Sequence, residues 1–240
     1  MLRHRKDGEE TRERLLESAY GVFAAKGFRG ATVAEICRGA GANIASVNYH
    51  FGSKAALYVA AWRHSLVRSL EAHPPDGGVP ASASAADRLR GRIRAIMARV
   101  SDPESHGLDI VMKEMANPTG LLAEVMRECL EPIRQGLLGV IRELLGPAAS
   151  EERVRLCHMS IMAQCFGPLL HERRRRREGK GLHPPSPDWV ALDVPTLADH
   201  VADFSLAGIR AVRRAASGKR AGRKKGTQRR RTRAARESRE

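Results

Sequence analysis

Aromatic residues are scarce in this 240-residue chain, at 4% of the sequence, whereas alanine, leucine, arginine and glutamate abound. The abundant residues are good helix formers because they lose little conformational freedom in a helix. No segment shows the alternation of apolar and polar residues that indicates a half-buried strand. With 42% hydrophobic residues the chain has enough apolar material for a core. We therefore predict an all-α globular fold.

Cysteine pairs and long apolar runs are also missing. The four cysteines, Cys37, Cys129, Cys157 and Cys165, show no C-x-x-C spacing, which disfavours a disulfide framework or a zinc site and indicates free thiols in a reducing cytosol. No apolar run approaches the roughly 18 residues of a membrane-spanning helix. The charged N-terminus lacks the apolar segment of a secretory signal. We expect a cytoplasmic protein without metal or cofactor.

The charge of the chain is unbalanced. The formal net charge is +15, and residues 217–240 contribute eleven Lys/Arg and two Glu, which leaves +6 for residues 1–216. This balance favours a polyanionic partner such as nucleic acid. Residues 216–240 are too charged to fold alone, and we predict a disordered basic tail that adds salt-sensitive, non-specific DNA affinity. A merely solubilising tail is the alternative.

The N-terminal segment reads as four helices. Residues 1–10 are charged and aperiodic and are predicted to form a mobile arm, whereas helical periodicity starts at Thr11 and Gly27 stands where a C-terminal cap belongs. Thr32 and Glu35 have capping-box spacing and open a short second helix. A third helix follows, and Ser53 is placed to cap a fourth.

The second and third helices form the motif on which the functional prediction depends. Residues 39–42 allow only a tight turn, and Asn43 is a good N-cap for a third helix that ends near His50. Two short helices around a small-residue turn, braced by a longer helix on each side, are typical of a helix-turn-helix, here over residues 32–51.

The short third helix has an inward and an outward side. Ala40, Ile44 and Val47 are placed to pack inward, which leaves Ala45, Ser46, Asn48, Tyr49 and His50 for a DNA groove. Small side chains allow close approach, and Asn48 can bond an adenine edge. Tyr49, His50 and Lys54 can reach phosphates.

The remaining chain is predicted to be helical after a low-complexity loop at residues 73–86. Asp102-Pro103 opens one helix, and Pro132 should kink or divide a long amphipathic stretch. A long helix covers 151 to about 178, and the last helix opens at Thr196 and ends near Arg213. We expect a DNA-binding domain over 9–69 and a larger helical domain over 87–215.

Residues 11–57 resemble the DNA-binding domain of the TetR/AcrR family of transcription regulators. The matching residues, in fixed order, are Phe23, Lys26, Gly27, Phe28, Thr32, Ile36, Ala40, Gly41 and the string Tyr49-His50-Phe51-Gly52-Ser53-Lys54. The resemblance implies DNA contacts, largely to phosphate, at Thr32, Ser46, Tyr49, His50 and Lys54. Asn48 departs from the tyrosine usual at its position. The full predicted set of DNA-binding residues is Thr32, Asn43, Ala45, Ser46, Asn48, Tyr49, His50 and Lys54.

The second half resembles the C-terminal domain of the CecR-like branch of that family. The similar segments are 113–119, Glu131-Pro132 and 160–165. The resemblance implies a ligand-gated repressor that forms a homodimer through its final two helices. The predicted effector-binding residues are Glu114, Met115, Met126, His158 and Met162, because thioethers adapt to varied ligands. Ordinary core packing is the alternative for each of them.

Two other classes of function are alternatives to a ligand-responsive repressor on a near-palindromic operator. One is a non-specific architectural DNA-binding protein driven by the basic tail. The other is an enzyme, for which the sequence offers no nucleophile elbow, phosphate-binding glycine pattern or paired carboxylates. We therefore predict a non-enzymatic protein with no catalytic residue.

Overall fold

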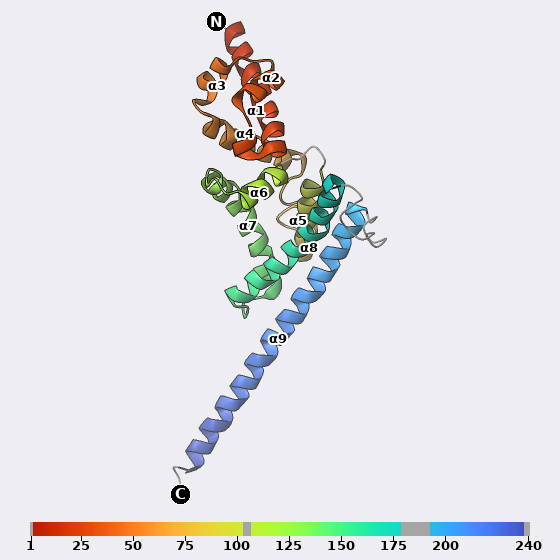
Figure 1. Ribbon diagram of the computed structural model, residues 1–240. Helices are drawn as coiled ribbons and strands as arrows, with labels where there is room; N and C mark the ends of the chain where they lie inside the picture. The colour runs from red at the N-terminus through yellow and green to blue at the C-terminus, as the bar shows by residue number, and fades with distance from the viewer. Residues whose placement is uncertain (1, 103–106, 179–192, 238–240) are drawn as a thin grey trace. The chain divides into compact units, whose positions relative to one another are not determined.

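The structure is a computed structural model that describes residues 2–102, 107–178 and 193–237, and the side chains of 7–102, 107–168 and 193–216. All the regular structure in these ranges is helical, which confirms the all-α prediction (Figure 1). None of the described helices has the length and apolar character needed to cross a membrane. The chain divides into two compact units, Met1–Pro75 with Ala98–Arg134, and Asp76–Met97 with Gln135–Glu240.

Helix α1 (Leu2–Gly30) starts earlier than the sequence analysis predicts. The expected arm over residues 1–10 is helical from Leu2, so that prediction was wrong. Charged residues without an apolar pattern are still good helix formers, and the packed part of α1 supplies the nucleus on which such a segment extends. At the other end Gly27 has φ 70° and ψ 175° and separates two helical segments of α1 at a kink, at the position where the sequence predicts the helix to end.

Gly27→Ala is expected to lower the free energy of unfolding by about 1–3 kcal/mol, since this backbone conformation is almost restricted to glycine. Gly21→Ala is the matched control in the same helix. No atom lies within 4 Å of its added Cβ, so the change should stabilise the protein by about 0.5–1 kcal/mol. Urea unfolding followed by circular dichroism measures both. Equal effects of the two substitutions would contradict the kink.

Helices α2 (Val33–Ala40), α3 (Ile44–Phe51) and α4 (Lys54–Ala72) have the caps that the sequence predicts. Thr32 and Glu35 form a complete capping box, and the Asn43 side chain accepts a hydrogen bond from the Ser46 amide. The Ser53 side chain caps α4 in the same way. Local side-chain chemistry therefore sets the start of each short helix.

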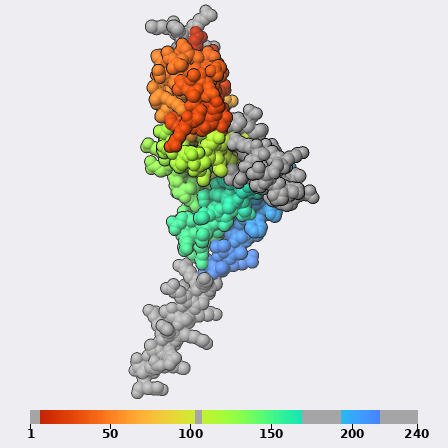
Figure 2. Space-filling view, in the orientation of Figure 1, coloured from red at the N-terminus to blue at the C-terminus, as the bar shows by residue number. Residues whose placement is uncertain are grey.

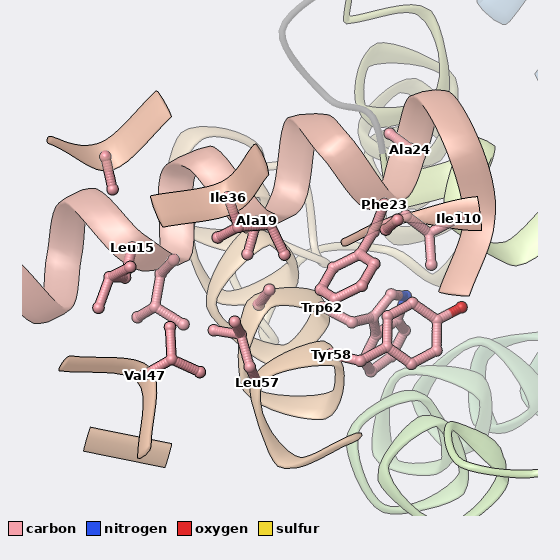
Figure 3. Close-up of a cluster of buried hydrophobic side chains, with 14 of the residues drawn as sticks. Leu15, Ala19, Phe23, Ala24, Ile36, Val47, Leu57, Tyr58, Trp62 and Ile110 are labelled. Atoms are coloured by element: carbon pink, nitrogen blue, oxygen red, sulfur yellow. The ribbon is translucent and has the colours of Figure 1, made fainter. Parts of the chain in front are cut away.

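The core of the first unit joins α1 to these short helices. Phe23 and Tyr58 meet edge to face with their ring centroids 4.8 Å apart, and both are buried. Figure 3 shows Leu15, Ile36, Val47 and Leu57 from four different helices pointing into the same cluster. Ser18 adds a hydrogen bond to the Ile36 carbonyl oxygen at 2.8 Å. The helix-turn-helix is thus held by tertiary packing rather than by helix propensity.

Helix α6 (Gly107–Ala116) belongs to the same unit and contributes Ile110 to its core. The Tyr58 hydroxyl donates to Glu114 at 3.1 Å, and the Thr119 and Gly120 amides donate to the same carboxylate at 2.8 and 3.0 Å. Burial and the Glu114 charge together raise the pKa of Tyr58. Glu114 therefore links α4 to the turn that follows α6. The predicted start at Pro103 lies outside the described residues.

Helix α7 (Ala123–Leu145) runs through Pro132 without interruption. Pro132 was expected to kink or divide this stretch. The helix is not divided at Pro132. Proline removes one backbone hydrogen bond from the helix. Val125 and Leu137, on either side, are buried, and their packing compensates for that loss.

The second unit contains most of α5 (Ala85–Ser101), the end of α7, α8 (Glu151–Glu178) and α9 (Val194–Glu237). The loop before α5 is a turn packed on that helix, since the Gly77 backbone approaches Gly91 too closely for any side chain. Arg94 of α5 pairs with Asp199 of α9 at 2.7 Å. Figure 1 shows α8 beside the first part of the long α9.

Two predictions about α9 were wrong. The Asp193 carboxylate accepts a hydrogen bond from the Thr196 amide at 3.0 Å, so Asp193, not Thr196, is the cap. The sequence analysis also ends this helix near Arg213 and makes 216–240 disordered, whereas α9 continues to Glu237. No proline follows Pro195, and alanine, arginine and lysine extend a helix that packing has already nucleated.

The two compact units cut the chain differently from the predicted domains. Residues 98–134 cluster with the N-terminal helices, while the sequence analysis assigns them to a domain over 87–215. The contacts of α6 with α1 and α4 explain this assignment. Which ranges fold independently stays a prediction, with 9–69 and 87–215 as the proposed limits.

Candidate DNA-binding interface

The recognition helix candidate α3 has one buried residue, Val47, which is 1% exposed. At the start of α3, the side-chain oxygen Oδ1 of Asn43 accepts hydrogen bonds from the Ser46 amide at 2.8 Å and from the Ser46 hydroxyl at 2.9 Å. An eight-residue helix is unstable alone. Val47 and the Asn43 cap therefore fix which side of α3 faces outward.

The outward side of α3 carries most of the predicted DNA-binding residues. Asn43, Ala45, Asn48 and Tyr49 are exposed, and Tyr49 shows 85% of its surface. Ser46 is half-buried because its hydroxyl bonds to Asn43. Asn43 has a structural role as the cap in addition to its predicted contact. This face combines an amide, a phenol and small side chains, which suits base edges and phosphates.

Ile44 faces outward, contrary to the prediction from the sequence. It was predicted to pack inward with Ala40 and Val47, but it is 55% exposed, while the other two are buried. On an eight-residue helix, three-residue spacing alone does not decide which of Ile44 and Val47 enters the core. The Asn43 cap geometry and the packing of Val47 decide it, and Ile44 joins the outward face.

The flanking residues place positive charge and hydrogen-bond donors beside α3. Thr32 is exposed and opens α2, while His50 is half-buried at the end of α3. Lys54, in the first turn of α4, lies with its ammonium 4.6 Å from the centre of the Phe28 ring. Arg12 lies over the Phe51 ring at 5.4 Å. Cation–π contacts of this kind hold a cation at a surface without neutralising it.

One carboxylate beside this face is neutralised within the protein. Glu35 accepts hydrogen bonds from Lys26 and from the Thr32 backbone and hydroxyl. The Lys26 hydrogen bond, followed by that of Thr32, lowers the pKa of Glu35. The charge of Glu35 is therefore paired with Lys26, which reduces its repulsion of a phosphate.

The five predicted effector-binding residues fall in both units. Glu114, Met115 and Met126 lie in the first unit, and His158 and Met162 lie one turn apart on α8 in the second. Glu114 is occupied by its internal hydrogen bonds, and Met126 packs against the first unit's core. Met115 is exposed. Their role in ligand binding stays a prediction.

A second surface feature consists of apolar side chains on α8 and α9 that face outward. Leu156 and Met159 of α8 and Phe204 of α9 are all more than half exposed. Leu156 and Met159 are three residues apart and share a helix face. We call Leu156, Met159 and Phe204 the apolar seam. The sequence signal is the helical spacing of these apolar residues.

No group of three or more His, Cys, Asp or Glu that could hold a metal occurs among the described residues. The four cysteines are free thiols, and burial raises the pKa of Cys165 to about 12. Such a thiol is protonated and unreactive at neutral pH.

The described residues are all-helical, and α3 is a capped two-turn helix beside a basic flank. This is the architecture of a helix-turn-helix protein. Figure 2 shows the α1–α4 surface, red to orange, as a closely packed body. The family of bacterial regulatory proteins named tetR matches residues 15–61. The C-terminal domain of the HTH-type transcriptional dual regulator CecR matches residues 85–209. The chain belongs to the TetR family of DNA-binding transcription regulators, with a C-terminal domain of the CecR type.

Individual relatives agree with this assignment. The chain is 31% identical over 138 residues to the transcriptional regulator TcmR of Streptomyces glaucescens, covering 54% of this chain and 58% of TcmR, which is less than two thirds of that regulator. It is 28% identical over 159 residues to the dual regulator CecR of Shigella flexneri, covering 62% and 71%. Both relatives are HTH-type transcriptional regulators.

Solved structures share the fold. The transcriptional regulator FadR of Bacillus subtilis, in complex with stearoyl-CoA, superposes with a TM-score of 0.61 at 17% identity, over 82% of this chain and 98% of FadR. A TetR-like transcriptional regulator from Rhodococcus sp. RHA1 gives 0.59 at 16% identity, over 83% and 96%.

Proposed function

We propose that this protein is a cytoplasmic, dimeric repressor that binds a near-palindromic operator and leaves it when a small molecule binds. The observation that carries the proposal is the outward face of α3, with Asn48 and Tyr49 exposed and Val47 buried beneath them. This arrangement supports insertion of α3 into a major groove. Thr32, Tyr49, His50 and Lys54 supply the phosphate contacts, and Asn43, Ala45, Ser46 and Asn48 lie closest to the bases.

The dimer forms through the apolar seam. Exposed large apolar residues mark interaction sites, and the final two helices both carry them, Leu156 and Met159 on α8 and Phe204 on α9. In a two-fold dimer the seam of one protomer meets the same seam of its partner, so α8 and α9 of both protomers build one interface. Two recognition helices then address half-sites separated by about one turn of DNA, roughly 34 Å, or somewhat more.

The effector is a small molecule bound among the helices of residues 87–215. His158 and Met162, one turn apart on α8, are half-buried and remain candidates for its contacts. The ligand favours a state whose two recognition helices no longer match the operator spacing. A coupling free energy of about 1–3 kcal/mol changes occupancy severalfold to a hundredfold. Mass spectrometry of protein purified without denaturation would identify a retained ligand.

DNase footprinting on the region upstream of the protein's own gene tests the proposal. We expect one protected near-palindrome and a gel shift that resists excess unrelated DNA. The variant lacking residues 217–240 should keep this specific site and lose mainly non-specific affinity, since those residues hold eleven Lys/Arg. An architectural DNA-binding protein would instead lose all binding with the tail and protect no defined site.

A further inference from the structure

Ile44 is a β-branched residue in the first turn of α3, and 55% of its surface is exposed. Its neighbours on the outward face are polar or small, namely Asn43, Ala45 and Asn48, and all three are exposed. Ile44 thus belongs to no part of the core of the first unit. Covering an apolar group at this position by a partner removes it from water and lowers the free energy of the complex.

The surroundings of Ile44 indicate which partner covers it. Ile44 and Asn48 are four residues apart and share one helix face, which is exposed and lies beside buried Val47. In helix-turn-helix proteins the N-terminal residues of this helix contact base edges. The exposed groups in a major groove are polar donors and acceptors, with one apolar exception, the C5-methyl group of thymine.

We propose that Ile44 is a specificity-determining residue that recognises a thymine methyl group in each operator half-site. This inference rests on the proposed function and adds to it the identity of one base. Ala45, with its single methyl group, lets the backbone of α3 approach the groove closely enough for the contact. Ile44 and Asn48 are separated by about 6 Å along the helix. The thymine therefore lies within about two base-pair steps of the adenine that Asn48 reads.

The test replaces each thymine of the footprinted operator, one at a time, by uracil, which removes only the methyl group. For the unchanged protein we expect one position in each half-site where uracil weakens binding by about fourfold, the effect of one buried methylene-sized group. Ile44→Ala should bind the unmodified operator more weakly and should be indifferent to uracil at that position. Ile44→Val should keep the sensitivity.

Val67→Ala is the matched control, because Val67 is a half-exposed apolar residue on α4 outside the recognition helix. It should leave both affinity and uracil sensitivity unchanged. The Ile44 inference is wrong if the protein binds a specific operator but no uracil substitution weakens that binding. It is also wrong if the Ile44→Ala protein keeps the same sensitivity to uracil. In both cases the proposed function stands. If no specific operator is bound at all, the proposed function itself is wrong, and this inference with it.

Discussion

Phe204→Asp is expected to dissociate the protein into monomers and to weaken operator binding by about 100- to 10,000-fold. Phe204 is 61% exposed on α9 and belongs to the apolar seam with Leu156 and Met159. In a two-fold interface the new carboxylates of both protomers come together, and burying them unpaired costs several kcal/mol. Loss of the second recognition helix removes the gain from bivalent binding.

Sedimentation equilibrium gives the mass of the Phe204→Asp protein, and gel shifts give its operator affinity. The monomer should keep its helical circular dichroism, since an exposed side chain contributes little to the fold of one chain. Met112→Asp is the control, because Met112 is also an exposed apolar residue but lies on α6. A Phe204→Asp protein that stays dimeric and binds the operator normally would contradict the seam.

Val47→Asp is expected to abolish operator binding through loss of the recognition helix. Val47 is the buried residue of α3 and is 1% exposed. Placing an unpaired carboxylate there costs about 3 kcal/mol or more. The eight-residue helix has little stability of its own to offset this cost.

Val67→Asp provides the matched comparison, because it makes the same exchange at a half-exposed position of α4. Urea unfolding should show a large destabilisation for Val47→Asp and little change for Val67→Asp, and amide exchange should locate the loss in α3. Sedimentation should still find a dimer for both. If Val47→Asp retained normal stability and operator affinity, α3 would not depend on its buried anchor.

The parts of the fold that local chemistry determines were predictable from the sequence. Thr32 with Glu35, Asn43 and Ser53 each cap the helix that they were predicted to cap, because a cap needs only a side chain and a nearby amide. The helix over Glu151–Glu178 was predicted from the helical spacing of its apolar residues, such as Leu156 and Met159.

What depended on tertiary contacts was not predictable. Ile44 and Val47 have the same spacing pattern, and only the packing of α1, α2 and α4 selects Val47 for the core. Glu114 suggested a ligand contact, but its hydrogen bonds come from Tyr58 and Thr119, which no sequence spacing connects to it. The start of α1 and the end of α9 were misplaced because charged helix formers give no apolar periodicity.

The sequence predicted which residues lie at the candidate site better than it predicted the contacts of their side chains within the protein. Asn48 and Tyr49 are exposed as expected, while Ser46 is partly used in the Asn43 cap and Lys54 lies over the Phe28 ring. Contact of any of these residues with DNA stays a prediction.

Photo-crosslinking on the footprinted operator tests most directly whether the outward face of α3 enters the DNA. Azidophenylalanine replaces Tyr49 in one variant and Phe204 in another, both with little change of shape. The account predicts that the probe at position 49 crosslinks to both operator half-sites and that the probe at position 204 crosslinks to the partner protomer. A probe at position 49 that leaves the bound DNA unmodified would contradict the account.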